Sequence, residues 1–151
     1  MSNFLRIGQV LPDLVAQNTN GVTTRVREHL GSKLTLLNFL HGTQCPECVN
    51  QLYSLQQHRE ELEDLGAAVI VITRDNPKSL ATFLLGARPR LEYAIFADPS
   101  SVAHHQVGVG GHTVWFVING KQIVRWLGPW RDRYRCIDYE MILRRLQRTK
   151  R

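Results

Sequence analysis

The sequence predicts an α/β fold built on a strand–helix–strand unit in the first half and a hairpin followed by a helix in the second. Residues 34–40 and 67–73 are short, almost continuous apolar runs, which are typical of parallel strands buried on both faces. Between them, from Pro46 to about Leu65, apolar residues recur at three- and four-residue steps, which indicates a helix. A strand, a helix and a strand in this order predict a right-handed unit with parallel strands.

The segment before this unit, residues 1–33, is predicted to be an irregular extension. Glycine and proline punctuate residues 7–14. The turn sequence at residues 18–21 predicts a short hairpin between its flanks. One helical turn is expected from Val26 to Leu30, ended by Gly31.

The second half alternates short elements with turn signals. Asn76-Pro77 is a helix cap, and Asn119-Gly120 is a strong signal for a hairpin turn. Asp138 is expected to cap a last helix with one apolar face. The predicted elements are a helix ending at Gly86, a strand at 93–97, a helix from 98 to about 106, strands at 113–118 and 122–127, and the last helix with Tyr139, Ile142, Leu143 and Leu146 on its apolar face.

Size and composition predict one globular domain spanning residues 1–151. The chain is 43% hydrophobic and 21% charged, which are ordinary values for a folded protein. No apolar stretch at the N-terminus is long enough for a signal peptide or a membrane span, so we expect a soluble, cytoplasmic protein without a membrane partner. Three cysteines do not form the framework of a disulfide-stapled secreted domain.

The chain is basic, with a formal net charge of +6. Much of this charge lies near the C-terminus, at Arg131, Arg133, Arg135, Arg144, Arg145, Arg148, Lys150 and Arg151. No nucleic-acid motif accompanies it, and stacking aromatics are not interleaved with it. We therefore interpret the cluster as a solvated helix face and expect no nucleic-acid partner.

The motif that carries chemistry is Cys45-Pro46-Glu47-Cys48, between the first buried strand and its helix. Two cysteines at this spacing, beside a strand–helix–strand pattern and without secretory features, indicate a redox dithiol. The alternatives are half of a structural metal site or two ordinary core cysteines. Pro46 suits the first helical position, which places Cys45 where the helix begins.

A helix N-terminus offers unpaired N–H groups and the positive end of the helix dipole, and both favour a thiolate. Cys45 is therefore the expected attacking sulfur, and Cys48, one turn further on, is expected to close a disulfide with it. This cycle needs no cofactor. The Glu47 carboxylate suits the dipole but repels a nearby thiolate, so we expect Glu47→Lys to favour the Cys45 thiolate.

Further details of the motif are similar to a known family. One more residue separates Phe39 from Cys45 than in thioredoxins, and Gln51-Leu52 and Leu55 follow the Cys-Pro-x-Cys. Residues 98–109, followed by a hairpin, add to the likeness. The chain thus resembles the thioredoxin-fold superfamily, in its alkyl hydroperoxide reductase/thiol-specific antioxidant (redoxin, peroxiredoxin-like) branch. The resemblance implies a three-layer α/β/α fold with a central mixed sheet, residues 1–33 being the redoxin-type N-terminal extension, and an antioxidant activity.

The chain departs from that pattern at several positions. Typical peroxiredoxins carry Pro and Thr where this sequence has Asn38 and Gly42, and no Arg in residues 113–118 matches the one on their later strand. The buried acid of thioredoxins is replaced by Phe39, and their cis-proline by His112, which Thr113 follows.

His112 has three interpretations. It assists thiol exchange, because histidine titrates near neutral pH; or it joins Cys45 and Cys48 in a soft-metal site resembling the Sco-type copper proteins; or it simply replaces the proline at a surface corner. His41 is either a counterpart of the Arg in the Arg-Gly pattern of peroxiredoxin-like proteins, lending positive charge near Cys45, or a solvated turn residue.

The other candidate residues have plainer interpretations. The pair His104-His105 is predicted to lie on a polar helix face. Cys136 is expected to be a lone, partly buried thiol, with a distant resolving cysteine as the alternative. The tryptophans are predicted to be core or rim residues, at Trp115, Trp126 and Trp130.

Three functions follow, in this order. The first is a thiol–disulfide oxidoreductase that cycles Cys45 and Cys48. The second is a thiol peroxidase in which Cys45 becomes a sulfenic acid and Cys48 resolves it. The third is a copper-binding protein using Cys45, Cys48 and His112. For the first two, the expected partners are protein or small-molecule disulfides or peroxides, together with a thiol electron donor.

Overall fold

The structure, a computed structural model, describes residues 4–110, 113–128 and 139–150. Along the chain these form β1 (Val15–Gln17), β2 (Thr23–Arg25), the 3-10 turn η1 (Val26–His29), β3 (Leu34–Leu40), α1 (Pro46–Gln57), α2 (Arg59–Asp64), β4 (Ala67–Thr73), α3 (Pro77–Gly86), β5 (Ala94–Ala97), α4 (Val102–Gln106), β6 (Val114–Asn119), β7 (Val124–Gly128) and α5 (Tyr139–Lys150). Within these ranges, the helices are all too short or too polar to span a bilayer.

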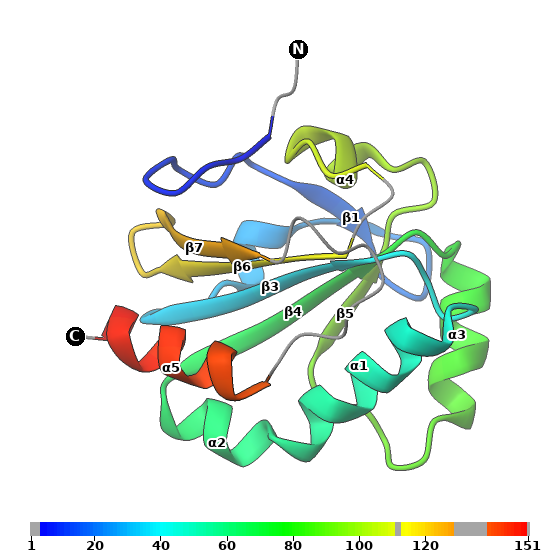
Figure 1. The fold of residues 1–151 in the computed structure, drawn as a ribbon. Helices are drawn as coiled ribbons and strands as arrows, with labels where there is room; N and C mark the ends of the chain where they lie inside the picture. The colour runs from blue at the N-terminus through cyan, green and yellow to red at the C-terminus, as the bar shows by residue number, and fades with distance from the viewer. Residues whose placement is uncertain (1–3, 111–112, 129–138, 151) are drawn as a thin grey trace.

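The strands of the described residues form one mixed sheet in the order β2-β1-β5-β4-β3-β6-β7 (Figure 1). β3 and β4 have the predicted bounds and run parallel along their whole length, from Leu34 opposite Ala67 to Leu40 opposite Thr73. Every residue of β3 is buried, as the continuous apolar run predicts. The carboxyl ends of β3 and β4 therefore lie side by side at one edge of the sheet.

Helices cover both faces of this sheet (Figure 1). The helices α1, α2 and α5 lie on one face, and α4 lies with the N-terminal segment on the other. Each face has its own apolar core: Leu52, Leu62 and Ile142 belong to the first, whereas Val107 and Phe116 belong to the second. The predicted α/β/α layers and central mixed sheet are confirmed, and the arrangement buries β3 between two helical layers.

The single helix predicted from Pro46 to about Leu65 is wrong, because the chain leaves the helical conformation at His58 (φ −102°, ψ 16°). The backbone N–H of His58 donates to the carbonyl oxygen of Ser54 at 3.1 Å. The ring Nδ1 of His58 lies 2.8 Å from the same oxygen. A second helix begins at Arg59, and acidic residues in its first turn suit the positive end of the helix dipole.

The helix predicted from Asp98 begins only at Val102. Asp98 stays outside it, because its carboxylate accepts the N–H groups of Ala103 and His104. The strands expected at 93–97, 113–118 and 122–127 are shifted or shortened by one or two residues at their ends. The predicted cap of the last helix, Asp138, lies outside the described residues.

Candidate active site

Cys45 is the N-cap residue of α1, at the end of the turn that leaves β3. Its backbone is extended (φ −91°, ψ 116°), and its sulfur accepts the N–H of Cys48 at 3.3 Å. Pro46 fills the first helical position, where a missing N–H costs nothing. The half-buried Cys45 sulfur therefore lies where the helix N–H groups and dipole favour negative charge.

Cys48 lies on the opposite, inward side of the same turn. It is 2% exposed and packs in the apolar core with Leu52 and Leu55. Burial, together with the hydrogen bond to Cys45, raises the pKa of the Cys48 thiol to about 11. The two thiols, both free, thus occupy different environments: Cys48 stays protonated at neutral pH, and Cys45 is the accessible one.

The turn that carries Cys45 is tied to the end of β4. The Asp75 carboxylate accepts the backbone N–H of Thr43 at 2.9 Å and the Thr43 hydroxyl at 3.1 Å. The N–H of Arg74 is bonded to the carbonyl oxygen of His41 at 3.3 Å. A side chain at Gly42 would come within 3.1 Å of the Asp75 carboxylate, so a residue without Cβ permits this close approach. These contacts fix the turn against the neighbouring strand.

A pocket of about 440 Å³ opens beside Cys45. Its lining combines residues from the turn, the start of α1, the end of β4 and the start of β6: His41, Gly42, Gln44, Cys45, Glu47, Arg74, Asp75 and Thr113. Three predicted supporting residues, His41, Glu47 and Thr113, therefore line the same pocket as Cys45, and Pro46 begins the helix next to it.

Sequence reasoning missed Arg74 and Asp75. Both directly follow the buried strand β4, which is parallel to β3. The carboxyl ends of neighbouring parallel strands meet at one edge of a sheet, where ligands commonly bind. Polar residues immediately after the second strand were thus a signal that they lie beside the dithiol turn.

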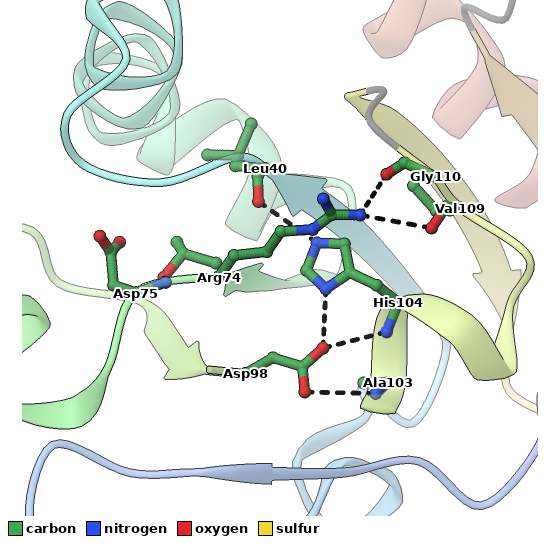
Figure 2. Close-up of polar contacts among 9 residues, drawn as sticks. Leu40, Arg74, Asp75, Asp98, Ala103, His104, Val109 and Gly110 are labelled. Carbon is green, nitrogen blue, oxygen red and sulfur yellow. Dashed lines mark hydrogen bonds and ion pairs between the residues drawn. The ribbon is translucent and has the colours of Figure 1, made fainter. Parts of the chain in front are cut away.

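The prediction that His104 lies on a polar helix face is wrong, because its side chain is buried, with 1% of its surface exposed. Figure 2 shows the contacts of its ring. Its ring Nδ1 lies 2.7 Å from the Asp98 carboxylate and its Nε2 lies 3.3 Å from the carbonyl oxygen of Leu40. Burial alone would raise the pKa of Asp98, but hydrogen bonds from the His104 ring and from two backbone N–H groups lower it. The buried pair thus connects α4 to the last residue of β3. The neighbouring His105 is exposed, as predicted.

His112 and Cys136 lie outside the described residues, as does Trp130. Trp115 and Trp126 are buried, in agreement with the prediction. Across the part of the chain that the structure describes, no group of three or more His, Cys, Asp or Glu side chains is arranged to hold a metal ion.

Comparison with models of protein families shows which family the chain belongs to. The model of the AhpC/TSA family matches residues 7–127, which includes the dithiol turn, the pocket residues and the whole sheet apart from the last residue of β7. The chain belongs to the AhpC/TSA family. It is a thiol-dependent oxidoreductase of the peroxidase or disulfide-exchange type, so the predicted family, enzyme class and general activity are confirmed.

Individual proteins similar to this AhpC/TSA-family chain are consistent with the family assignment. Over 129 residues it is 28% identical to a Haemophilus influenzae protein provisionally named peroxiredoxin bcp, covering 78% of the chain and 81% of that protein. Its fold is similar to that of peroxidoxin BcpB from Mycobacterium tuberculosis (TM-score 0.83, 18% identity, 95% and 97% of the two chains). It is also similar to a Chlorobium tepidum protein provisionally assigned as the thiol:disulfide interchange protein DsbE (TM-score 0.80, 20% identity, 97% and 99%).

The family assignment gives no support to the copper-binding alternative. The structure also shows where two of the side chains that depart from the typical motifs lie. Phe39 faces away from α1 and packs edge-on against the His104 ring, with the ring centres 5.0 Å apart. Asn38, its neighbour on β3, is fully buried and points to the α1 side by strand alternation.

Proposed function

We propose that the protein cycles between a reduced dithiol and a disulfide joining Cys45 to Cys48, with Cys45 as the attacking sulfur. The observation that carries this proposal is the contrast between the two thiols. Cys45 lines a pocket at a helix N-terminus, whereas Cys48 is 2% exposed with its pKa raised to about 11. Because the thiolate is the reactive form, Cys45 reacts first and Cys48 resolves.

With a peroxide, the Cys45 thiolate attacks one oxygen, an S–O bond forms and the O–O bond breaks. The departing oxygen takes the electron pair and is then protonated, leaving Cys45 as a sulfenic acid. Cys48 then attacks the Cys45 sulfur, a disulfide forms and water leaves. A thiol donor returns the dithiol by exchange.

With a disulfide substrate, Cys45 forms a mixed disulfide and releases the first thiol, and Cys48 displaces the second. Membership of the AhpC/TSA family and the likeness to peroxiredoxin bcp support peroxides as the substrate. The dithiol spacing, with a fold similar to that of DsbE, supports disulfide exchange as the second candidate. The cytoplasmic location and the single domain over residues 1–151 stay predictions.

Rapid mixing of the reduced protein with tert-butyl hydroperoxide or with oxidised glutathione, followed by acid quench and mass spectrometry, tests the cycle. We expect the wild-type protein to lose both thiols. Cys48→Ser is expected to stop at a sulfenic acid with the peroxide, trapped by dimedone, or at a mixed disulfide with glutathione. Oxidation of Cys45→Ser as fast as the wild type, or no Cys45–Cys48 disulfide with either oxidant, refutes the proposal.

A further inference from the structure

A second pocket, of about 850 Å³, lies along the later part of α3 and is called the α3 pocket below. Its other walls are the loop that leads into β5, the start of β5, and the turn between β1 and β2, which lies beside α3 (Figure 1). The helix begins two residues after Asp75, which lines the dithiol pocket, whereas its residues in the α3 pocket start at Ala81. Since the two pockets share no lining residue, they are separate sites.

Much of the α3 pocket is lined by apolar side chains. Ile95 is buried there, while Leu84 and Leu91 are partly buried. Leu85 also lines the pocket and is 79% exposed, so a ligand that covers it removes apolar surface from water. The volume lies within the range of about 300–1,000 Å³ that is usual for pockets binding small organic molecules. The α3 pocket therefore suits a ligand with an apolar body.

The charged side chains of the α3 pocket are both basic. Among the described residues that line it, Arg88 and Arg90 are charged and none is acidic. Arg88 is anchored over the C-terminal end of α3, where its Nη1 donates to the carbonyl oxygens of Leu85 and Ala87 at 3.0 and 2.7 Å. Because this helix end carries negative partial charge, it offsets part of the charge of Arg88.

Arg90 is not offset in this way. The ion pairs within the described ranges involve other side chains, and none of the hydrogen bonds there uses the Arg90 guanidinium. The acidic residue closest to it in sequence, Glu92, is turned to α1. Its carboxylate accepts a hydrogen bond from the Gln56 amide at 3.0 Å and lies 3.5 Å from Arg59. One exposed guanidinium with all of its donors available thus lies beside an apolar surface.

The walls of the α3 pocket are fixed before a ligand arrives. The loop before β5 is bonded to α1, because the Glu92 N–H donates to the side-chain oxygen of Gln56 at 2.7 Å and the Tyr93 hydroxyl to the carbonyl oxygen of Leu52 at 2.6 Å. On the opposite wall, the Asn18 side-chain oxygen accepts two backbone N–H groups of its own turn, at 2.9 and 3.0 Å. A preformed pocket loses little conformational entropy when a ligand binds.

We propose that the α3 pocket binds a small organic monocarboxylate, with its carboxylate on Arg90 and its apolar body against Leu84, Leu91 and Ile95. The planar guanidinium donates two parallel N–H groups to a carboxylate. A single uncompensated cation matches a single negative charge, whereas a phosphate monoester carries about −1.5 to −2 at neutral pH. This binding site is independent of the dithiol cycle proposed above.

A pair of ligands that differ only in charge tests the proposal. NMR titration of the reduced protein compares 4-phenylbutyrate with 4-phenylbutan-1-ol, which is neutral and of nearly equal size. We expect both to shift the amide signals of Leu84 and Leu91, and the acid to bind about tenfold more tightly. In Arg90→Gln the acid should lose about tenfold in affinity and the alcohol less than about twofold, because a hydrogen bond between charged groups contributes at least that factor.

Arg125→Gln is the matched control, since it removes the same charge from an exposed position on β7 outside the pocket. We expect it to bind both ligands as the wild type does. An equal loss of affinity in Arg90→Gln and Arg125→Gln would overturn the proposal, because the acid would then respond only to net charge. Equal affinity of the wild type for acid and alcohol would also overturn it. So would the absence of any shift at about 5 mM acid, where a Kd of about 1 mM leaves most sites occupied.

Two further arms locate the site and test its apolar part. Acetate has the carboxylate without the apolar body, so displacement of 4-phenylbutyrate by an equal concentration of acetate would overturn the proposal. Cys45→Ser is expected to bind 4-phenylbutyrate as the wild type does. Shifts confined to Gln44 and Thr113, which line the dithiol pocket, would place the ligand there and refute the α3 site. Because the measurement is binding and not turnover, failure of the dithiol cycle leaves this proposal standing.

Discussion

Asn38 is a polar side chain in the middle of the most buried strand. It is 0% exposed, and neither of its amide atoms has a hydrogen-bond partner in the described part of the chain. Trp115 lies directly opposite Asn38 on β6, and its buried indole N–H also has no hydrogen-bond partner among the described residues. A buried polar group without a partner lowers stability by its lost hydration. The unpaired polar groups of Asn38 and Trp115 therefore lower the stability of the folded protein at the sheet face that α1 covers.

We expect Asn38→Leu to raise the free energy of unfolding by about 1–3 kcal/mol, because it replaces an unpaired buried amide with an apolar side chain of similar size. Urea denaturation of the reduced protein measures this. The matched control is Asn119→Leu, since the Asn119 side-chain oxygen accepts the N–H groups of Lys121 and Ile123 and its loss should destabilise the hairpin. A lower urea midpoint for Asn38→Leu would show that the amide has a stabilising partner.

At the scale of elements, the dithiol turn depends on the neighbouring parallel strand. The turn has few residues of its own to fix it, and its Thr43 is held by Asp75 across a gap of 32 positions in the sequence. His104 adds a second connection, from α4 to the last carbonyl of β3. The position of Cys45 thus depends on contacts with β4 and α4 as well as on the bond within the turn from its own N–H to the carbonyl oxygen of Gly42 at 3.3 Å.

Loss of the Asp75 carboxylate should loosen this turn. In Asp75→Ala we expect amide hydrogen exchange at Thr43 to speed up by about ten- to a hundredfold, because a hydrogen bond to a charged group contributes about 1.5–3 kcal/mol. Exchange followed by NMR measures it. Asp64→Ala, at the exposed end of α2, is the control and should leave Thr43 unchanged. Unaltered exchange in Asp75→Ala would mean that the turn is held without this carboxylate.

For the whole molecule, burial of Cys48 in the core links the redox site to global stability. The pKa of Cys48 is raised from 9.0 to about 11, first by burial and then by the hydrogen bond to Cys45. A raised pKa means that the folded state binds the proton more tightly than the unfolded state. The contribution of this group to the stability of the folded state is complete below pH 9, the pKa of the thiol in the unfolded chain. It is lost as the pH rises towards 11, the pKa in the folded protein.

The reduced wild-type protein should therefore lose stability between pH 9 and 11 more steeply than Cys48→Ala, which lacks the titrating thiol. Urea midpoints across this range, measured under reducing conditions, give the two slopes. Stability below pH 9 should be nearly independent of pH for this group. Parallel curves for the two proteins would show that Cys48 is not protected by the core.

The sequence by itself determined what depends on local pattern. The apolar runs at 34–40 and 67–73 defined both central strands to the residue, because strands buried on both faces admit few polar residues. The Cys-Pro-x-Cys spacing placed Cys45 at the helix N-terminus and Cys48 one turn inward. The helix break at His58 was not predicted, because it lies in a change of two backbone dihedral angles (φ −102°, ψ 16°) that the apolar spacing on either side does not encode.

Only the tertiary structure decided which side chains line the pocket beside Cys45. Arg74 and Asp75 are distant from Cys45 in sequence and reach it because β4 pairs in parallel with β3. The buried pair of His104 and Asp98 forms because α4 folds back over the end of β3. Contacts of this kind depend on strand order and register, which set distances between residues that no local spacing encodes.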